Sequence, residues 1–183
     1  MTLYSKAFKV NIKKDNAYRI GSSNNEPYEL VLNTYCYEHS NYYETLSIAI
    51  DNYASERRIA ILGTMFTEDQ ESAILTDNDL IVLVDSALIV IDCHTLGLKA
   101  NKELPEGVYF SIHDFDDGYI VYGELEIVKV SAAPEYNVEW AFSGADIFVT
   151  QDKSRPFEIK GDVVYLRDWN GQEYAVSRNG KEL

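Results

Sequence analysis

The second half of the chain repeats one strand–turn–strand pattern about every forty residues. Paired apolar segments, each pair split by a short polar break, occupy Leu80–Ile91, Tyr119–Val130 and Val163–Val176. Short β-branched and aromatic runs around a polar break are typical of β-hairpins. Counted from the first residue of each stretch, the spacings are 39 and 44 residues. Hairpins at this period predict an all-β chain built of repeated, antiparallel four-stranded sheets.

Turn-forming residues precede each predicted hairpin, at Asp77–Asp79, Asp116–Gly118 and Lys160–Asp162. In the second of these turns we expect Gly118 to supply a positive φ. The third hairpin contains Asn170-Gly171, the pair favoured in a tight type I′ turn, because both central residues of that turn need φ > 0.

Three segments of the chain resemble the degenerate repeats of quinoprotein-like and WD-like β-propellers: DNDLIVLVDSALIVIDCHTLGL, FDDGYIVYGELEIVKV with the following VEWAF, and KGDVVYLRDWNGQEYAVSRNGK. The resemblance covers about residues 72–183. No copy carries the complete Gly-His and Trp-Asp signature, and Glu139–Phe142 is similar to only part of the Trp- and Gly-rich docking motif of quinone-binding repeats. The resemblance implies the fold of antiparallel blades and implies neither a function nor the quinone.

Residues 1–71 supply further strands without the repeat. Phe8, Val10 and Ile12 alternate with Lys9, Asn11 and Lys13 in one half-buried strand. Apolar runs follow at Tyr28–Tyr37, Thr45–Ile50 and Arg58–Phe66. The whole chain, residues 1–183, then reads as a single all-β domain, with one or two irregular blades before residue 72. The length allows a four-bladed ring or a partial propeller, and a β-sandwich is the alternative.

Open sheet edges would follow from an incomplete ring. Edges invite pairing with another chain, and lysines protect them. The lysine-rich strand Lys9–Lys14 would serve as such an edge, or would pair with an acidic strand of a second copy in a homo-oligomer.

The charge is strongly acidic and uneven. Thirty acidic and 16 basic side chains give a net charge of −14, while residues 1–19 hold five basic groups against Asp15 alone. A phosphate backbone or an anionic membrane would be repelled, so we expect no nucleic acid and no membrane as partner. The charge favours a basic protein as partner, and solubility alone is the other explanation.

The chain shows no apolar core of a signal peptide near its first residues. Its longest apolar stretch, Leu80–Asp92, is interrupted by Asp85 and is too short to cross a bilayer. Cytoplasmic location, with Cys36 and Cys93 reduced, is the resulting expectation.

Two sets of residues resemble fragments of metal sites. Cys36 and His39 have the spacing of paired zinc ligands, whereas adjacent Cys93 and His94 would point to opposite faces of a strand. The segment from Asp114 to Gly118 has the start of a calcium loop, but the alternation of oxygen ligands fails at the third position. We therefore expect no metal and no cofactor.

His113, Asp114, Asp116 and Asp117 form the densest polar cluster. A histidine beside a carboxylate titrates near neutral pH and suits general base catalysis. No nucleophile elbow and no phosphate-binding glycine loop accompanies the cluster. A small enzyme or a ligand-binding propeller with its site near His113–Asp117 is the alternative function, and the residues favour a protein that is not an enzyme.

Tyrosines are concentrated between residues 28 and 53, where six of the fourteen lie among acidic residues. Tyrosine is enriched in protein-binding surfaces because its ring is large and rigid and its tip is polar. Packing of these rings across ordinary strands is the alternative. We expect a non-enzymatic protein-binding module, of the immunity or inhibitor type, that contacts a basic partner through Tyr35, Tyr37, Tyr42, Tyr43, Glu38 and Glu44. A sensor domain that completes its sheet against a second chain is a further possibility.

Overall fold

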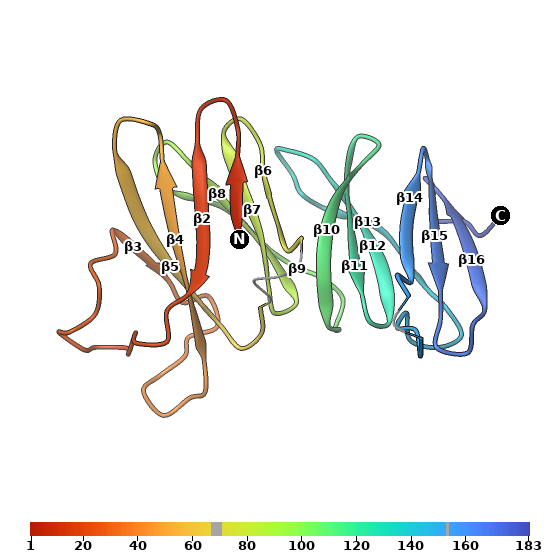
Figure 1. Cartoon of the computed structure of the whole chain (residues 1–183), viewed down its shortest axis with the longest axis horizontal. Helices are drawn as coiled ribbons and strands as arrows, with labels where there is room; N and C mark the ends of the chain where they lie inside the picture. The colour runs from red at the N-terminus through yellow and green to blue at the C-terminus, as the bar shows by residue number, and fades with distance from the viewer. Residues whose placement is uncertain (67–70, 153) are drawn as a thin grey trace. The chain divides into compact units, whose positions relative to one another are not determined.

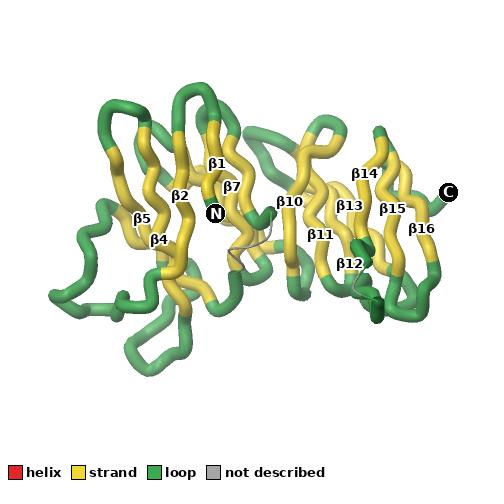
Figure 2. The backbone as a smooth tube through the Cα atoms, in the orientation of Figure 1, coloured by secondary structure: helices red, strands yellow, loops and turns green. Residues whose placement is uncertain are grey.

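Strands are the only regular secondary structure in the part of the chain that the structure describes (Figure 2). The computed structural model describes residues 1–66, 71–152 and 154–183. In these described residues sixteen strands form four sheets, and the chain divides into two compact units, Met1–Asn101 and Lys102–Leu183. Among the described residues no helix is long and apolar enough to span a membrane.

The first sheet of unit 1 has five strands in the order β1-β2-β4-β5-β3 (Figure 1). All neighbours are antiparallel except β3, which runs parallel to β5 at the outer edge. The strands are β1 (Thr2–Tyr4), β2 (Lys9–Lys14), β3 (Leu30–Leu32), β4 (Glu44–Asp51) and β5 (Glu56–Gly63).

The second sheet of unit 1 is a four-stranded meander in the order β6-β7-β8-β9. Its strands are β6 (Ala73–Leu75), β7 (Asp79–Val84), β8 (Ala87–Asp92) and β9 (Leu98–Glu103).

Unit 2 has one four-stranded and one three-stranded meander. The strands of the first are β10 (Tyr109–Phe115), β11 (Gly118–Gly123), β12 (Glu126–Ser131) and β13 (Val138–Ser143). Those of the second are β14 (Phe157–Lys160), β15 (Val163–Arg167) and β16 (Glu173–Ser177).

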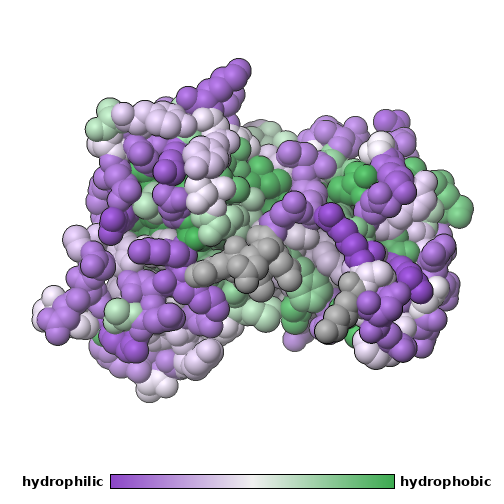
Figure 3. Space-filling model, viewed as in Figure 1, coloured by the Kyte–Doolittle hydropathy of each residue, from purple (hydrophilic) through white to green (hydrophobic). Residues whose placement is uncertain are grey.

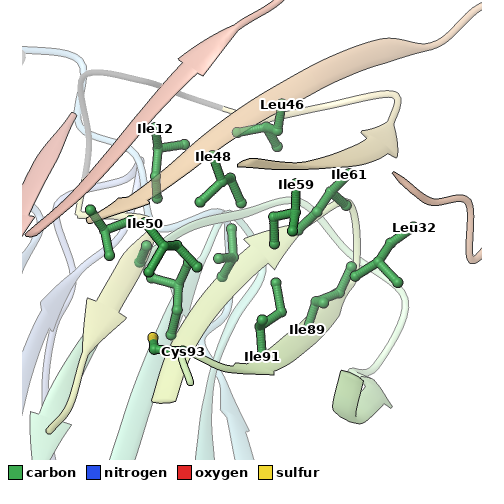
Figure 4. Packing of buried hydrophobic residues seen from close by; sticks show 14 of the residues in the cluster. Ile12, Leu32, Leu46, Ile48, Ile50, Ile59, Ile61, Ile89, Ile91 and Cys93 are labelled. Carbon is green, nitrogen blue, oxygen red and sulfur yellow. The ribbon is translucent and has the colours of Figure 1, made fainter. Parts of the chain in front are cut away.

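The core of unit 1 lies between its two sheets. Leu46, Ile48 and Ile50 alternate along β4 toward this core and are at most 2% exposed. Isoleucines of β5 lie beside them, and Ile89 and Ile91 of β8 approach from the other sheet (Figure 4). Burial of each such side chain contributes roughly 1.5–3 kcal/mol, so this interlayer core holds the first five strands in place.

Unit 2 has a separate core between its own two sheets. Ile120 and Tyr122 of β11 pack with Val164 and Leu166 of β15. Phe148, in the connection between the sheets, is fully buried among them. The hydroxyl of Tyr122 donates to the carbonyl oxygen of Phe148, which fixes that connection on the core.

The all-β class with antiparallel sheets is confirmed, as are the three predicted hairpins, now β7–β8, β11–β12 and β15–β16. Ring closure and the single-domain organisation stay predictions.

The expectation of a lysine-protected edge is wrong. The strand Lys9–Lys14 is β2, which pairs with β1 on one side and with β4 on the other. β1 covers Lys9–Asn11 on one side and β4 pairs with the whole of β2 on the other, so β2 is an inner strand rather than the edge of the sheet. Association of two copies through other sheet edges stays a prediction.

The predicted strand Tyr28–Tyr37 is shortened to β3. The Asn33 side chain ends it: its amide Nδ2 donates to the carbonyl oxygen of Tyr37, and its Oδ1 accepts from the Tyr37 N–H, both at 2.8 Å. Asparagine competes with strand pairing in this way wherever its side chain can close a local ring of backbone bonds.

Two turn predictions are also wrong in detail. Gly118 does not have a positive φ; Asp116 does, at 54°. In the β15–β16 loop only Gly171 has a positive φ, whereas a type I′ turn needs two such residues. The loop instead spans Asp168 to Gln172, closed by a hydrogen bond from the Asp168 N–H to the Gln172 carbonyl at 3.0 Å.

Candidate functional site

The predicted tyrosine surface lies on the loop of residues 33–43, here called the tyrosine loop, between β3 and β4. Aromatic rings follow one another along it: Tyr35 and Tyr37 have ring centroids 6.0 Å apart, and Tyr37 and Tyr43 lie 6.1 Å apart in a stacked arrangement. Tyr42 is 75% exposed and Tyr35 is 37% exposed, while the other two rings are half-buried. The structure therefore brings the four predicted tyrosines together and presents two of them to solvent.

Asp85, in the β7–β8 turn, fixes the tyrosine loop. Its Oδ1 accepts hydrogen bonds from the N–H and hydroxyl of Thr64 and from the N–H of Met65, at 2.7–2.8 Å. Its Oδ2 accepts from the Tyr37 hydroxyl at 3.2 Å. Burial, with the nearby Asp85 charge, raises the pKa of Tyr37 to about 12, so this hydroxyl stays protonated and keeps donating.

A second loop, residues 15–21, packs against the tyrosine loop. The Ile20 N–H donates to the Tyr43 hydroxyl at 2.9 Å, and the Asp15 N–H donates to the Thr45 carbonyl at 2.8 Å. Gly21 has a φ of 73°, and a Cβ there would lie 2.8 Å from Cε1 of His39. One hydrogen bond thus joins the two loops, a second joins residues 15–21 to the start of β4, and Gly21 lies close beside His39, at one end of the five-stranded sheet (Figure 1).

A cavity of about 370 Å³, here called the loop pocket, lies between these two loops. Its lining combines tyrosine rings with charged and amide side chains: Asp15, Asn16, Tyr18, Arg19, His39, Asn41, Tyr42, Tyr43, Glu44 and Thr45.

The Asp15 carboxylate holds one wall of the loop pocket. Its Oδ1 accepts from the backbone N–H groups of Ala17 and Tyr18, and its Oδ2 accepts from the Tyr28 hydroxyl at 2.7 Å. Desolvation opposes the charge, but these hydrogen bonds and nearby Lys13 lower the pKa of Asp15 on balance. The carboxylate is therefore ionised at neutral pH.

The two predicted acidic residues differ in surroundings. Glu44 forms an ion pair with Lys14 at 2.8 Å and is half-buried. Glu38 is exposed and, among the described residues, takes part in no ion pair. Only Glu38 therefore adds an uncompensated negative charge to the tyrosine loop. Hydrophilic residues also cover much of the face of the chain shown in Figure 3.

The second predicted cluster, His113 to Asp117, is divided among different neighbours. His113 on β10 lies 2.8 Å from the Ser111 hydroxyl, and its ring packs on Phe157 with centroids 4.9 Å apart. Asp114 follows it directly in the strand and so points to the other face. Asp116 and Asp117 lie exposed in the β10–β11 turn. The strand thus separates His113 from the carboxylate next to it in the sequence.

A buried lysine near this turn was missed by sequence reasoning. Lys129 on β12 is 1% exposed, and its ammonium donates to the Phe115 carbonyl and to Oδ1 of Asp117, each at 3.0 Å. The ion pair lowers the pKa of Asp117. In the sequence, Lys129 is a single lysine within the apolar residues of β12. The alternation of apolar and polar residues does not reveal which acidic residue would pair with it.

The cysteines and histidines of the hypothetical zinc site have different environments. Cys36 is exposed, with a φ of 55°, and Cys93 is buried in the core of unit 1. Burial raises the pKa of the Cys93 thiol to about 12, so this thiol is protonated at neutral pH. Within residues 1–66, 71–152 and 154–183, no group of three or more His, Cys, Asp or Glu could hold a metal ion.

No family model matches the chain, and no curated protein matches it. Among solved structures, the chain is similar to the β-propeller domain of Cps50 (Swd1) from Myceliophteria thermophila, with 11% sequence identity and a TM-score of 0.48. The matched region covers 80% of this chain and 57% of that domain.

Proposed function

We propose that the chain is a non-enzymatic protein-binding module that uses the tyrosine loop to contact a basic protein. The observation that carries the proposal is the exposure of Tyr42, at 75%, on a loop that is fixed at both flanks. Loops that present large apolar rings to water without covering them are typical of interaction surfaces. A loop that is already ordered loses little conformational entropy on binding.

The net charge of −14 supports a basic partner, because opposite charge accelerates encounter. The role we propose is that of an inhibitor or immunity-type protein, which covers a basic enzyme or toxin in the cytoplasm. Negative charge and an ordered aromatic surface are the two properties that this role requires physically.

The proposal is tested with defined peptides and isotope-labelled full-length protein. Twelve-residue peptides of alternating arginine or lysine with glycine are titrated at low and high salt, and matched glutamate peptides serve as the control. We expect the basic peptides to shift amide resonances of residues 33–43, with an affinity that falls as salt rises. Shifts confined to other residues, or an affinity indifferent to salt, would overturn the proposal.

Substitutions test which tyrosine contributes. Tyr35→Ala and Tyr42→Ala are each expected to weaken binding of the basic peptides by about fivefold or more. Tyr4→Ala is the matched control, because Tyr4 on β1 is 68% exposed and lies outside the tyrosine loop. Equal losses for all three variants would contradict a specific surface.

A further inference from the structure

We infer that the loop pocket is the subsite that receives one arginine side chain of the basic partner, an inference that rests on the proposed function. Its volume of about 370 Å³ lies at the lower end of ligand pockets. A single long side chain fits within such a space. The identity of the group follows from the lining.

The lining of the loop pocket has the chemistry that recognises a cation with a flat face. Tyr18, Tyr42 and Tyr43 contribute aromatic rings. A cation within about 6 Å of a tyrosine ring is attracted by the negative face of the ring. Guanidinium groups stack on such rings, because they are planar and weakly hydrated.

Two carboxylates complete the match to an arginine. Asp15 and Glu44 both line the loop pocket. The hydrogen bonds to Asp15 keep that group charged, and Oε1 of Glu44 accepts no hydrogen bond from the described residues. A planar guanidinium offers five N–H donors in a geometry that fits carboxylates, which is why we name arginine rather than lysine.

The pocket already holds one cation, Arg19, but this guanidinium is directed to its own loop. Its NH1 donates to the carbonyl oxygens of Asn16 and Tyr18. The lining thus carries Asp15 and Glu44 against Arg19. Lys14 pairs with Oε2 of Glu44 from outside the lining, so Oε1 of Glu44 is the oxygen that would receive the entering guanidinium.

Hydrogen bonds on both sides of the loop pocket support a built subsite. The hydrogen bonds of Ile20 with Tyr43 and of Asp15 with Thr45 hold the two walls together. Binding of one side chain would therefore require little reorganisation.

The test compares three tripeptides that differ in a single side chain: acetylated and amidated Gly-Arg-Gly, Gly-Lys-Gly and Gly-citrulline-Gly. Citrulline keeps the shape of arginine and removes its charge. Titrated into the labelled full chain, the arginine peptide is expected to shift resonances of His39, Asn41 and Thr45 at lower concentration than the lysine peptide, and the citrulline peptide is expected to shift them least. Equal responses to arginine and citrulline would overturn the inference, and tighter binding of lysine would overturn the choice of arginine.

Variants locate the site. Tyr42→Ala is expected to weaken binding of the arginine tripeptide about three- to tenfold, whereas Tyr42→Phe keeps the ring face and most of the affinity. Glu44→Gln is expected to weaken binding of this tripeptide similarly. Glu106→Gln is the control, because Glu106 is exposed, lies in unit 2 and belongs neither to the lining nor to the tyrosine loop. An unchanged affinity in Tyr42→Ala and Glu44→Gln would overturn the assignment.

The failure of this inference is distinguishable from failure of the proposed function. If longer basic peptides bind through Tyr35 while the tripeptides leave the loop pocket unaffected, the pocket assignment fails and the binding surface stands. If no basic peptide shifts any resonance of residues 33–43, both fail.

Discussion

At the scale of single residues, the space beside Gly118 is filled by the Lys129 side chain and by the backbone of β12. A Cβ on Gly118 would lie 2.2 Å from the carbonyl oxygen of Val130 and 2.7 Å from the Lys129 ammonium. The carbonyl belongs to the ladder between β11 and β12 and cannot retreat without breaking that pairing. Glycine is required here for close approach, which is a different reason from the turn conformation that the sequence suggests.

Gly118→Ala is therefore expected to destabilise the protein by about 2–3 kcal/mol through overpacking. The measurement is the free energy of unfolding from urea denaturation. Gly107→Ala is the matched control, because its Cβ would approach Tyr109 no closer than 3.7 Å, an ordinary contact. Equal costs for the two variants would contradict the steric explanation.

A second single residue, Asp85, controls the tyrosine loop from a distance in sequence. Asp85→Ala removes the acceptor of three hydrogen bonds around Thr64 and of one from Tyr37. We expect a loss of stability of about 2 kcal/mol. We also expect faster hydrogen exchange in residues 33–43.

Asp77→Ala, at an exposed turn position, is the control for Asp85→Ala and is expected to change stability by less than about 0.5 kcal/mol. Unchanged exchange rates in the tyrosine loop of Asp85→Ala would show that Asp85 does not fix it.

At the scale of elements, the turn from β8 to β9 depends on one ionised carboxylate. Hydrogen bonds from the backbone N–H groups of Thr95 and His94, together with Lys99, lower the pKa of Asp92 from 3.8 to about 2. A lowered pKa means that the folded state favours the charged form. Its contribution to stability is thus complete above pH 4 and is lost as the pH falls toward 2.

Asp92→Asn is expected to be less stable than the unmodified chain at pH 6, with a difference that shrinks between pH 4 and pH 2. Urea denaturation at a series of pH values measures it. A difference that stays constant across that range would contradict the assigned role of the charge.

The elements that the sequence predicts correctly are those that depend on residues close together in the chain. The hairpins β7–β8, β11–β12 and β15–β16 follow from apolar runs around polar breaks, which act over a few residues. β3 was predicted too long, because the apolar pattern does not show that Asn33 closes a ring of hydrogen bonds with Tyr37. The place of β2 inside the sheet likewise depends on which strand pairs with which, and lysines alone do not reveal it.

The candidate site was predictable in composition but not in contacts. The concentration of tyrosines between residues 28 and 53 indicates where to look. The tether from Tyr37 to Asp85 joins positions 48 apart, and the ion pair of Lys129 with Asp117 joins positions 12 apart. The first contact depends on how the two sheets of unit 1 stack, and the second depends on how the β10–β11 turn lies beside β12. The hydrophobic pattern of the sequence specifies neither arrangement.

At the scale of the whole molecule, acidic charge is shared by both units. Residues 1–101 carry 14 acidic and 8 basic side chains, and residues 102–183 carry 16 and 8. The sequence isoelectric point is about 4.5. We expect solubility to be lowest near that pH and to rise on both sides, as repulsion between copies returns. Turbidity measured from pH 3 to pH 8 checks this, and a minimum of solubility at neutral pH would contradict it.

The burial of Lys129 has a consequence for chemical labelling. Amine-reactive acylating reagents need a free, accessible amine, and this amine is enclosed while unit 2 is folded. Lysines at the surface, such as Lys160, should be acylated at once, whereas Lys129 should be acylated only when β12 separates from its neighbours. The rate of its modification, followed by mass spectrometry, would report the opening of unit 2 from a single natural side chain.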